Sequence, residues 1–508
     1  MNKESATPVA DVCLILEGSY PYISGGVSSW THDLIHMQAH LNFHLLILLA
    51  PGSERKSRYS LPENVVGTSE ITLQRPGKGK SKVPGASKII QKLELALSRL
   101  MHDGGYHDLE SLLEILKANK AHIGSKFLLD SVAAWDMLLQ MYQRDFSSSS
   151  FLDYFWTWRG LLGGLYSVLL ADLPDAKVYH SISTGYAGLF LARAKIETGR
   201  PALLTEHGIY TNERRIEIAM ADWLHEDVSL QGMVIERTRR NLRDLWMHSF
   251  QSYSRACYEA CDRIITLFEG NQSFQLHDGA DRNRMAVIPN GIDYERFAKL
   301  KKRNSERRFS VALIGRVVPI KDVKTYIRAF AQVREIMPRV KGYLLGPCDE
   351  DPDYYEECKQ LVEHLGISNG FEFTGKVDLL NWMERIDLIV LTSISESQPL
   401  VILEAGAAGI PCVATDVGAC REMIEGDSQE FPPLGHGGAV VPLSNPAATA
   451  RAIIKQLSDP ALLESSGKAI RERVQTYYNK EDLKEKYRVL YSKYINQSDS
   501  NACIERVG

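Results

Sequence analysis

The chain has 508 residues, of which 44% are hydrophobic and 24% are charged. At roughly 100–200 residues per domain this length exceeds one ordinary core, so we expect two or more domains. Lysine and arginine number 59 against 63 aspartates and glutamates, which gives a formal net charge of −4. This near balance excludes any argument from overall charge for a nucleic acid or an anionic membrane as a partner.

The cysteines and the apolar runs of the sequence bear on the cellular compartment of the protein. Eight cysteines are scattered along the chain and form no repeated CxxC pattern, so reduced thiols are expected. The polar start of the chain, with Glu4, predicts no secretory leader. Apolar runs such as Leu45 to Ala50 have the length of strands, not of membrane helices. We take a cytoplasmic protein as the default.

Strands and helices alternate in the first part of the chain. The first strand is expected at residues 11–16, and Gly25 and Gly26 precede a helix that begins near Ser28. A strand, a glycine turn and a helix are the opening of a doubly wound α/β unit. Further strands are expected at residues 43–49, 176–181, 202–205, 263–267 and 285–288.

Residues 53–170 interrupt this alternation. Lysines and arginines are mixed with glycine and proline from Arg75 to Lys88, a composition that predicts a mobile loop. Apolar residues then recur at spacings of three and four, which is typical of helices. The helices are expected at residues 87–102, 107–120, 126–143 and 151–170. We interpret residues 53–170 as a helical insertion in the first domain.

A second α/β series follows the charged stretch 300–308. Its strands are expected at residues 309–314, 341–345, 371–373, 388–391, 411–414 and 439–441, with helices between them. Parallel strands need such crossover helices. We therefore predict an α/β protein with two Rossmann-like domains, 1–298 and 299–476, that face a central cleft. A helix in residues 477–508 is expected to pack back on the first domain.

Two cations lie in the turn after the first strand of the second domain. Arg316 and Lys321 flank the start of a helix, where free N–H groups favour an anion. Arginine offers a bidentate fork and lysine a point charge, which together suit a diphosphate. For this motif alone, two solvated surface cations are an equally good interpretation.

Two glutamates separated by seven residues form a sharper motif. Glu396 lies in the turn after the strand 388–391, and Glu404 lies on the next helix, for which Pro399 suits the first position. Carboxylates accept hydrogen bonds from paired hydroxyls, such as those of a sugar or a ribose. A single glutamate here is more often an acid favoured by the helix dipole. The pair, in the same domain as the two cations, favours a functional role.

These four residues, with Gly25-Gly26 and the segment 288–293, resemble the GT4 family of retaining glycosyltransferases of GT-B fold, over both domains. The segments 17–22, 25–30, 206–211 and 346–352 are similar to those of the PelF-type glycosyltransferases of Pel exopolysaccharide synthesis. The helical insertion also agrees with that group. The resemblance implies retention by attack on the same face of the sugar, with the leaving phosphate taking the acceptor proton.

The resemblance also implies the ligands and partners. The donor is a UDP-sugar, the acceptor is a glycan, and neither a metal nor another cofactor nor a nucleic acid is expected. The resemblance further implies that the product is an exopolysaccharide made at the cytoplasmic side of the membrane. Recruitment to inner-membrane synthesis and export proteins is expected, with the insertion as the candidate docking surface.

By resemblance, Arg316 and Lys321 hold the diphosphate, Glu404 binds the ribose hydroxyls and Glu396 contacts the donor sugar. His207 matches a family histidine close to that sugar. The catalytic candidates are thus Arg316, Lys321, Glu396 and His207. The other donor-site candidates are Gly25, Gly26, Lys376, Val377, Gln398, Leu400, Val401 and Glu404.

Departures and alternatives remain. Many family members have glycine shortly after the first glutamate, whereas Ser397-Gln398-Pro399 stands here and Pro399 has no N–H to donate. Asp351-Pro352-Asp353 imitates a metal-binding DxD, yet the cations already supply the donor site, and we expect no metal there. Two other functions stay open: another GT-B nucleotide-sugar enzyme, such as a 2-epimerase, and a non-catalytic nucleotide-sugar-binding subunit.

Overall fold

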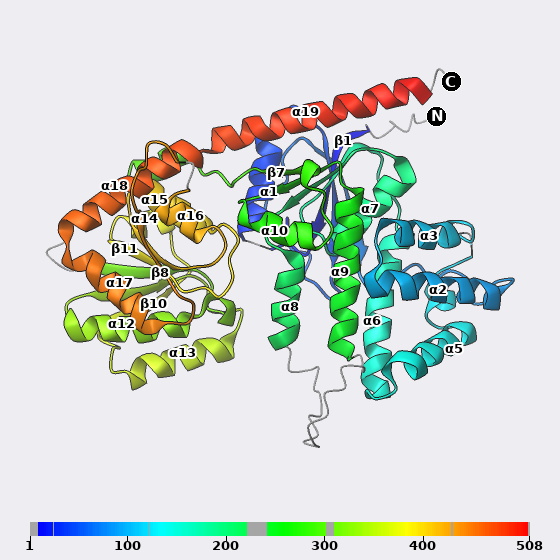
Figure 1. The fold of residues 1–508 in the computed structure, drawn as a ribbon, viewed down its shortest axis with the longest axis horizontal. Helices are drawn as coiled ribbons and strands as arrows, with labels where there is room; N and C mark the ends of the chain where they lie inside the picture. Colours follow the sequence, from blue (N-terminus) through cyan, green and yellow to red (C-terminus); the bar gives the residue numbers. More distant parts are fainter. Residues whose placement is uncertain are drawn as a thin grey trace. The chain divides into compact units, whose positions relative to one another are not determined.

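The structure is a computed structural model that describes residues 9–23, 25–120, 122–220, 241–300, 309–427 and 430–505. The chain divides into two compact units (Figure 1). The first comprises Met1–Val287 with Tyr487–Gly508, and the second comprises Ile288–Lys486. The sequence predicts the domain boundary after residue 298, because a charged stretch follows there. The contacts within the structure instead divide the two units before Ile288. The sequence also predicts a long helical stretch from Asn212 to Cys261, and residues 221–240 of this stretch lie outside the described residues.

The first unit is built on a parallel sheet with the strand order β3-β2-β1-β4-β5-β6-β7. Its order reverses between β1 and β4, where Leu14 pairs with Leu45 on one side and with His180 on the other. The expected strands are present, and β3 is an addition. The strands are β1 (Ala10–Glu17), β2 (Phe43–Leu49), β3 (Val65–Thr72), β4 (Ala176–Ser181), β5 (Ala202–Glu206), β6 (Arg263–Thr266) and β7 (Met285–Val287).

The helices of the first unit include those of the expected insertion. They are α1 (Gly26–Met37), α2 (Ala86–Asp103), α3 (Tyr106–Lys117), α4 (Ser125–Leu128), α5 (Val132–Met141), α6 (Phe151–Leu170), α7 (Tyr186–Thr198), α8 (Tyr210–Met220), α9 (Leu242–Ala260) and α10 (Gly270–His277). The helix expected at 126–143 is two helices, because the hydroxyl of Ser131 accepts from Ala134 N and starts α5 anew. Figure 1 shows α2, α3 and α5 gathered beside α6.

The basic loop that the sequence predicts to be mobile is instead held by backbone hydrogen bonds. Gly77 O accepts from Ser125 N at 2.8 Å, and Lys80 N donates to His122 O at 2.9 Å. Gly79 has φ +58°, and a Cβ at this position would lie 2.5 Å from Gly124 N. Two glycines therefore let the loop cross the segment before α4 in direct backbone contact.

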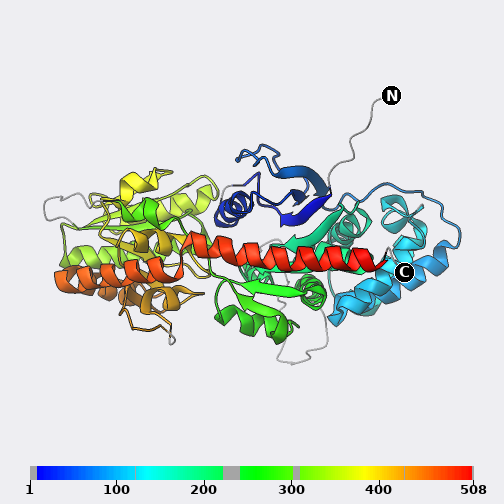
Figure 2. The same ribbon diagram turned by 90° about the horizontal axis from the view of Figure 1, so that it is seen from above.

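The C-terminal helix α19 (Lys480–Glu505) belongs to the first unit from Tyr487 onward. There it packs on the sheet (Figure 2), and its tyrosines reach buried polar groups. Tyr491 Oη lies 2.7 Å from His180 Nδ1, and Tyr487 Oη lies 2.8 Å from Thr205 Oγ1. Thr205 Oγ1 in turn lies 2.9 Å from His180 Nε2, so the helix is tied to β4 and β5.

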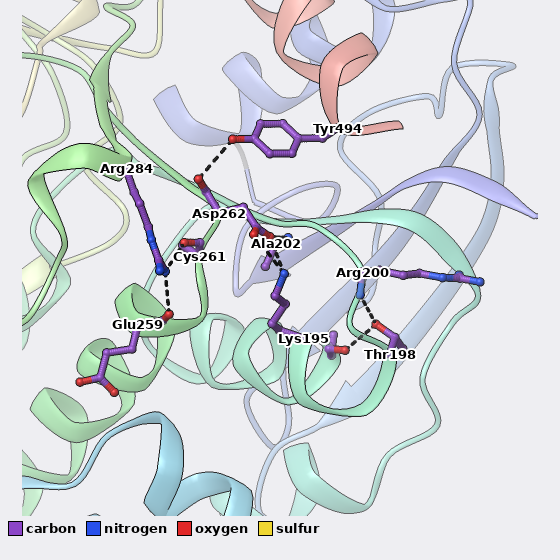
Figure 3. A network of polar contacts seen from close by, with 10 residues as sticks. Lys195, Thr198, Arg200, Ala202, Glu259, Cys261, Asp262, Arg284 and Tyr494 are labelled. Atoms are coloured by element: carbon purple, nitrogen blue, oxygen red, sulfur yellow. Dashed lines mark hydrogen bonds and ion pairs between the residues drawn. The ribbon is translucent and has the colours of Figure 1, made fainter. Parts of the chain in front are cut away.

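A second polar network lies where β5 and β6 begin (Figure 3). Asp262 accepts from Lys195 Nζ and from Ala202 N, both at 2.8 Å. Tyr494 of α19 donates to the backbone oxygen of Asp262 at 3.2 Å. The same residue thus joins α7, β5 and the C-terminal helix.

The second unit has a parallel sheet with the order β10-β9-β8-β11-β12-β13, which reverses between β8 and β11. Its strands are β8 (Ser310–Ile314), β9 (Lys341–Leu345), β10 (Phe371–Gly375), β11 (Leu388–Leu391), β12 (Cys412–Thr415) and β13 (Gly438–Val441). Its helices are α11 (Tyr294–Ala298), α12 (Val323–Ile336), α13 (Pro352–His364), α14 (Leu379–Met383), α15 (Leu400–Ala407), α16 (Cys420–Glu425), α17 (Pro446–Ser458) and α18 (Pro460–Tyr477). Both units are therefore doubly wound, which confirms the predicted α/β class. Among the described helices, none combines the length and the apolarity needed to cross a membrane.

Candidate functional site

Most candidate residues of the second unit lie where its strand order reverses, the position at which open α/β sheets bind ligands. The turn after β8 and the loop after β11 are bonded to each other there. Thr392 Oγ1 donates to the backbone oxygens of Lys321 and Asp322 at 3.1 and 2.9 Å. Ile394 N donates to Ile320 O at 2.9 Å.

Lys321 and Glu396, predicted from separate motifs, are in contact. Lys321 Nζ lies 2.5 Å from Glu396 Oε1, and Ser393 Oγ donates to the same oxygen at 2.6 Å. The side chains are only 20% and 13% exposed, so the pair is largely screened from water. The structure thus places one cation and one carboxylate at the reversal, where they neutralise each other.

Arg316 lies in the same turn but does not join this pair. It is half exposed and forms an ion pair of 2.5 Å with Glu350, which follows β9. The two turns approach so closely that a Cβ at Gly346 would lie 2.0 Å from Gly315 O. The sequence assigns no role to Glu350. Its pairing with Arg316 depends on the contact between two turns, and such a contact leaves no characteristic spacing in the sequence.

The loop that carries Glu396 rests on a glycine turn. Gly418 has φ +53°, and a Cβ at this position would lie 2.3 Å from the backbone oxygens of Glu396 and Ser397. Ala419 N donates to Ser397 O at 2.7 Å. Gln398 is buried, and its Oε1 accepts from Asn290 N at 2.6 Å, so this side chain is occupied within the protein.

Helix α15 begins at Leu400, one residue later than the sequence predicts, because Pro399 takes the cap position. The N–H groups of Leu400 and Val401 lie in the first turn, where no intrahelical acceptor exists. Glu404 lies further along α15, and its side chain has no hydrogen-bond partner among the described residues. Burial raises the pKa of Glu404 to about 7, against a smaller lowering by the charge of Arg296.

The remaining candidates of this unit, Lys376 and Val377, follow β10. Lys376 is exposed and Val377 is partly buried. Gly375, which precedes them, accepts at its backbone oxygen from Gly346 N at 2.9 Å, so this turn adjoins the one after β9. Strands β8, β10 and β11 therefore contribute candidates beyond their carboxyl ends, and the turn after β9 contributes Glu350, the partner of Arg316.

The candidates of the first unit lie in the connections that follow β1 and β5. Gly25 is extended at φ 172°, with open space around its α-carbon, and Gly26 is the first residue of α1. His207 follows β5, and burial lowers its pKa to about 4. Its Nε2 is buried without a hydrogen-bond partner among the described residues, and its ring lies 4.4 Å from that of Trp30.

The strand-order reversal of the first unit is filled by a carboxyl group of the chain itself. Glu17, at the end of β1, accepts from Ala187 N in the first turn of α7 and from Tyr210 Oη, both at 3.0 Å. Burial raises the pKa of Glu17. An N–H group at this helix start is therefore already bonded to a carboxylate, whereas no carboxylate among the described residues bonds to the first turn of α15.

Glu206, at the end of β5, was also missed by sequence reasoning. It accepts from Tyr258 Oη at 2.7 Å and from Gln275 Nε2 at 2.8 Å, and burial raises its pKa. Its partners come from α9 and α10, so only the tertiary structure reveals that it is buried.

Among the described residues, no group of three or more His, Cys, Asp and Glu side chains is arranged to hold a metal ion. In the DxD-like segment, Asp351 accepts from Tyr354 N at 3.0 Å and thereby caps α13. Its carboxylate thus has a structural role in the helix.

Two family models match the chain. Residues 10–283 match the model described as a domain of unknown function (DUF3492), and residues 308–459 match the one described as Glycosyl transferases group 1. A D-inositol 3-phosphate glycosyltransferase of Streptomyces bingchenggensis is 30% identical over 225 residues, which are 41% of this chain and 48% of that protein. The chain thus spans about half the length of this relative.

Solved structures resemble the chain over nearly its full length. The Anabaena protein Alr3699/HepE in complex with UDP has a TM-score of 0.57 at 15% identity and covers 95% of this chain and 100% of its own. Sucrose-phosphate synthase from Thermosynechococcus elongatus has a TM-score of 0.59 at 17% identity and covers 96% of this chain and 100% of its own. These likenesses confirm the predicted fold, two Rossmann-like α/β domains of GT-B type.

Proposed function

We propose that this chain, which belongs to the family described as a domain of unknown function (DUF3492), is a glycosyltransferase that binds a nucleotide-sugar donor in its second unit. The observation that carries the proposal is the contact of Lys321 with Glu396 at the strand-order reversal. The match to Glycosyl transferases group 1 covers the same residues and supports it. So does the relative that bears a glycosyltransferase name.

In this proposal the donor diphosphate displaces Glu396 from Lys321. A phosphate oxygen brings the negative charge that Lys321 needs, and the N–H groups at the start of α15 add donors. Arg316 supplies a bidentate fork once it leaves Glu350. Glu396, released, accepts from a hydroxyl of the donor sugar, and Glu404 accepts from the ribose hydroxyls. The UDP complex of the Anabaena protein supports uridine as the nucleoside of the donor.

The reaction forms a bond between an acceptor oxygen and the anomeric carbon, and it breaks the bond from that carbon to the phosphate oxygen. The acceptor proton passes to the leaving phosphate, on the same face of the sugar, so the anomeric configuration is retained as in GT4 enzymes. Lys321, Arg316 and the α15 terminus stabilise the charge that develops on the diphosphate, a preorganised effect worth several kcal/mol. We propose that these cations replace a metal ion. His207, whose neutral imidazole can donate or accept, is proposed to contact the sugar.

We further propose that the product is an exopolysaccharide of Pel type, made at the cytoplasmic side of a membrane. This step rests on the resemblance of the segments 17–22, 206–211 and 346–352 to the PelF-type enzymes. Recruitment to inner-membrane synthesis and export proteins, through the insertion, is part of the same proposal.

The test is release of nucleoside diphosphate from a panel of UDP-, ADP- and GDP-sugars by the purified chain. We expect turnover with a UDP-sugar, unchanged by EDTA, and a loss of about 100-fold or more in Lys321→Ala. Lys324→Ala is the matched control, because Lys324 pairs with Glu357 on the surface of α12 and α13. NMR spectroscopy of the product then identifies the anomeric configuration of the new linkage. An inverted linkage would refute retention.

Two results would favour the alternatives. Conversion of the UDP-sugar to its 2-epimer, without transfer, would indicate an epimerase. Calorimetric binding of UDP-sugars without release of UDP from any of them would indicate a non-catalytic binding subunit.

A further inference from the structure

A cavity of about 740 Å³ opens in the helical insertion of the first unit. The loop after β3, α4, α6 and the start of α9 form its walls. Its volume falls in the range of roughly 300–1,000 Å³ that is usual for small-molecule sites. The lining residues on which the argument depends are Gln74, Arg75, Lys78, Asp153, Trp156 and Trp246. None of them belongs to the proposed donor site.

Two indole rings line this cavity. Trp156 is 61% exposed, although burying an aromatic ring of this size is favourable. Trp246 stacks on Phe250 with ring centroids 5.7 Å apart, and its buried Nε1–H has no hydrogen-bond partner among the described residues. A buried donor without an acceptor costs about 1–3 kcal/mol. A ligand with both an apolar face and an acceptor would satisfy the two rings.

A glycine of α6, Gly160, also lines the cavity. A Cβ at Gly160 would lie 3.7 Å from the ring of Trp246 and 3.7 Å from Gln74 Nε2. The glycine thus leaves room between an aromatic ring and an amide.

Charged groups of both signs surround the rings. The side chains of Arg75, Lys78 and Asp153 have neither an ion pair nor a hydrogen bond to any described residue. Arg159, in contrast, is engaged by Asp130 at 2.8 Å. Free donors and a free acceptor next to apolar rings match a ligand that carries many hydroxyl groups.

The wall that carries Lys78 is preformed. Lys78 O accepts from Lys126 N at 3.0 Å, and Gly77 O accepts from Ser125 N at 2.8 Å. A preorganised wall reduces the entropy lost when a ligand binds.

We propose that this cavity binds an oligosaccharide, as a subsite for the acceptor chain. A sugar ring presents one apolar C–H face, which can lie on an indole, and a rim of hydroxyls, which can bond to Gln74, Arg75, Lys78 and Asp153. A purely apolar ligand would leave these polar groups unsatisfied. The inference rests on the proposed function, because a glycosyltransferase must hold a glycan acceptor.

The test is calorimetric titration of the full chain with tetrasaccharides of three chemistries: maltotetraose, chitotetraose and a hyaluronan tetrasaccharide. We expect at least one to bind, and Trp156→Ala to weaken it by about tenfold or more, as expected for the loss of one aromatic contact. Trp246→Phe keeps an aromatic ring, although a smaller one, but removes the N–H, and we expect a smaller loss. Trp135→Ala is the matched control, because this 44% exposed tryptophan of α5 packs on Phe151 and Phe155 and does not line the cavity.

The outcomes separate this inference from the proposed function. Oligosaccharide binding that depends on Trp156, in a chain without turnover, would keep this inference and reject the enzyme. No binding by any tetrasaccharide, or binding unchanged in Trp156→Ala, would overturn it. So would a Trp156-dependent affinity for anionic phospholipid vesicles in place of sugars.

Discussion

Lys321 and Glu396 are 75 residues apart in the chain, yet their charged atoms meet at 2.5 Å where the strand order of the second unit reverses. The two belong to different loops, and each is largely buried. The contact therefore couples the turn after β8 to the loop after β11. A diphosphate that takes Lys321 frees Glu396, so binding at one loop changes the charge available at the other.

We predict that the two charges stabilise the second unit in a coupled manner. Lys321→Met leaves Glu396 with only Ser393 and is expected to cost about 1–3 kcal/mol, and Glu396→Gln a similar amount. The double variant should cost less than the sum of the single ones, by about 0.5 kcal/mol or more. Hydrogen exchange of peptides from the second unit, measured across urea concentrations, provides the free energies. The surface variant Lys324→Met should cost under about 1 kcal/mol. Additive single effects would show that the pair is not coupled.

A second prediction concerns the turn beneath Glu396. Gly418→Ala would place a Cβ 2.3 Å from two backbone oxygens, so the loop must shift. Gly366→Ala is a matched control, since Gly366 has φ +66° and nothing within 4 Å of that position. Both variants suffer the left-handed strain of about 1–2 kcal/mol. Only Gly418→Ala should also weaken UDP binding in calorimetry. Equal UDP affinities in the two variants would contradict the support that we assign to Gly418.

The strands and their order of appearance could be predicted, because buried parallel strands are continuous apolar runs. β3 escaped prediction because the stretch Val65–Thr72 is mostly polar and only one of its residues is fully buried. The sequence predicts that Lys321 and Glu396 belong to the same site, but it does not predict that they contact each other. The pairing of Arg316 with Glu350 could not be predicted, because it depends on backbone contact between two turns.

The basic loop from Arg75 shows a second limit. Its composition is that of a mobile segment, and composition alone cannot reveal a partner 45 residues away. The crossing with Gly124 depends on two glycines whose spacing carries no periodic signal. Similarly, Glu17 and Glu206 look like ordinary strand ends in the sequence, and only the packing of α7, α9 and α10 makes them buried acceptors.

We predict that the C-terminal helix is held by its buried tyrosines. Tyr491→Phe leaves His180 Nδ1 without its partner and is expected to destabilise the first unit by about 1–3 kcal/mol. Urea denaturation followed by hydrogen exchange of the α19 peptides measures this loss. The control Tyr477→Phe removes a hydroxyl from a 41% exposed tyrosine of α18 and should have no measurable effect. Equal effects of the two substitutions would argue against the network.

The same network predicts a pH dependence. Burial lowers the pKa of His180 to about 3, whereas its ordinary value is 6.5. Below pH 6.5 the unfolded chain binds a proton that the folded chain does not, so the free energy of unfolding falls as the pH decreases toward 3. At pH 5.5 the loss from this histidine is about 1.4 kcal/mol. His180→Asn should be less stable at pH 7.5 but should show a shallower decrease. An unchanged pH slope would mean that His180 is not the group that titrates.

The last prediction concerns Glu404, whose pKa burial raises from 4.5 to about 7. Between these values the folded chain holds a proton that the unfolded chain has lost, so the free energy of unfolding decreases as the pH rises from 4.5 to 7. Glu404→Gln should therefore gain stability over the wild type through this interval, by up to about 3 kcal/mol above pH 7. The exposed Glu363→Gln of α13 is the control and should run parallel to the wild type.

Binding should show the opposite preference, because the ionised carboxylate is the better acceptor for ribose hydroxyls. UDP-glucose affinity in the wild type should increase as the pH rises through 7, since its diphosphate does not titrate there, and Glu404→Gln should bind weakly at every pH. A variant that gains stability but keeps full affinity at pH 8 would leave Glu404 as a partly buried acid with no part in the donor site.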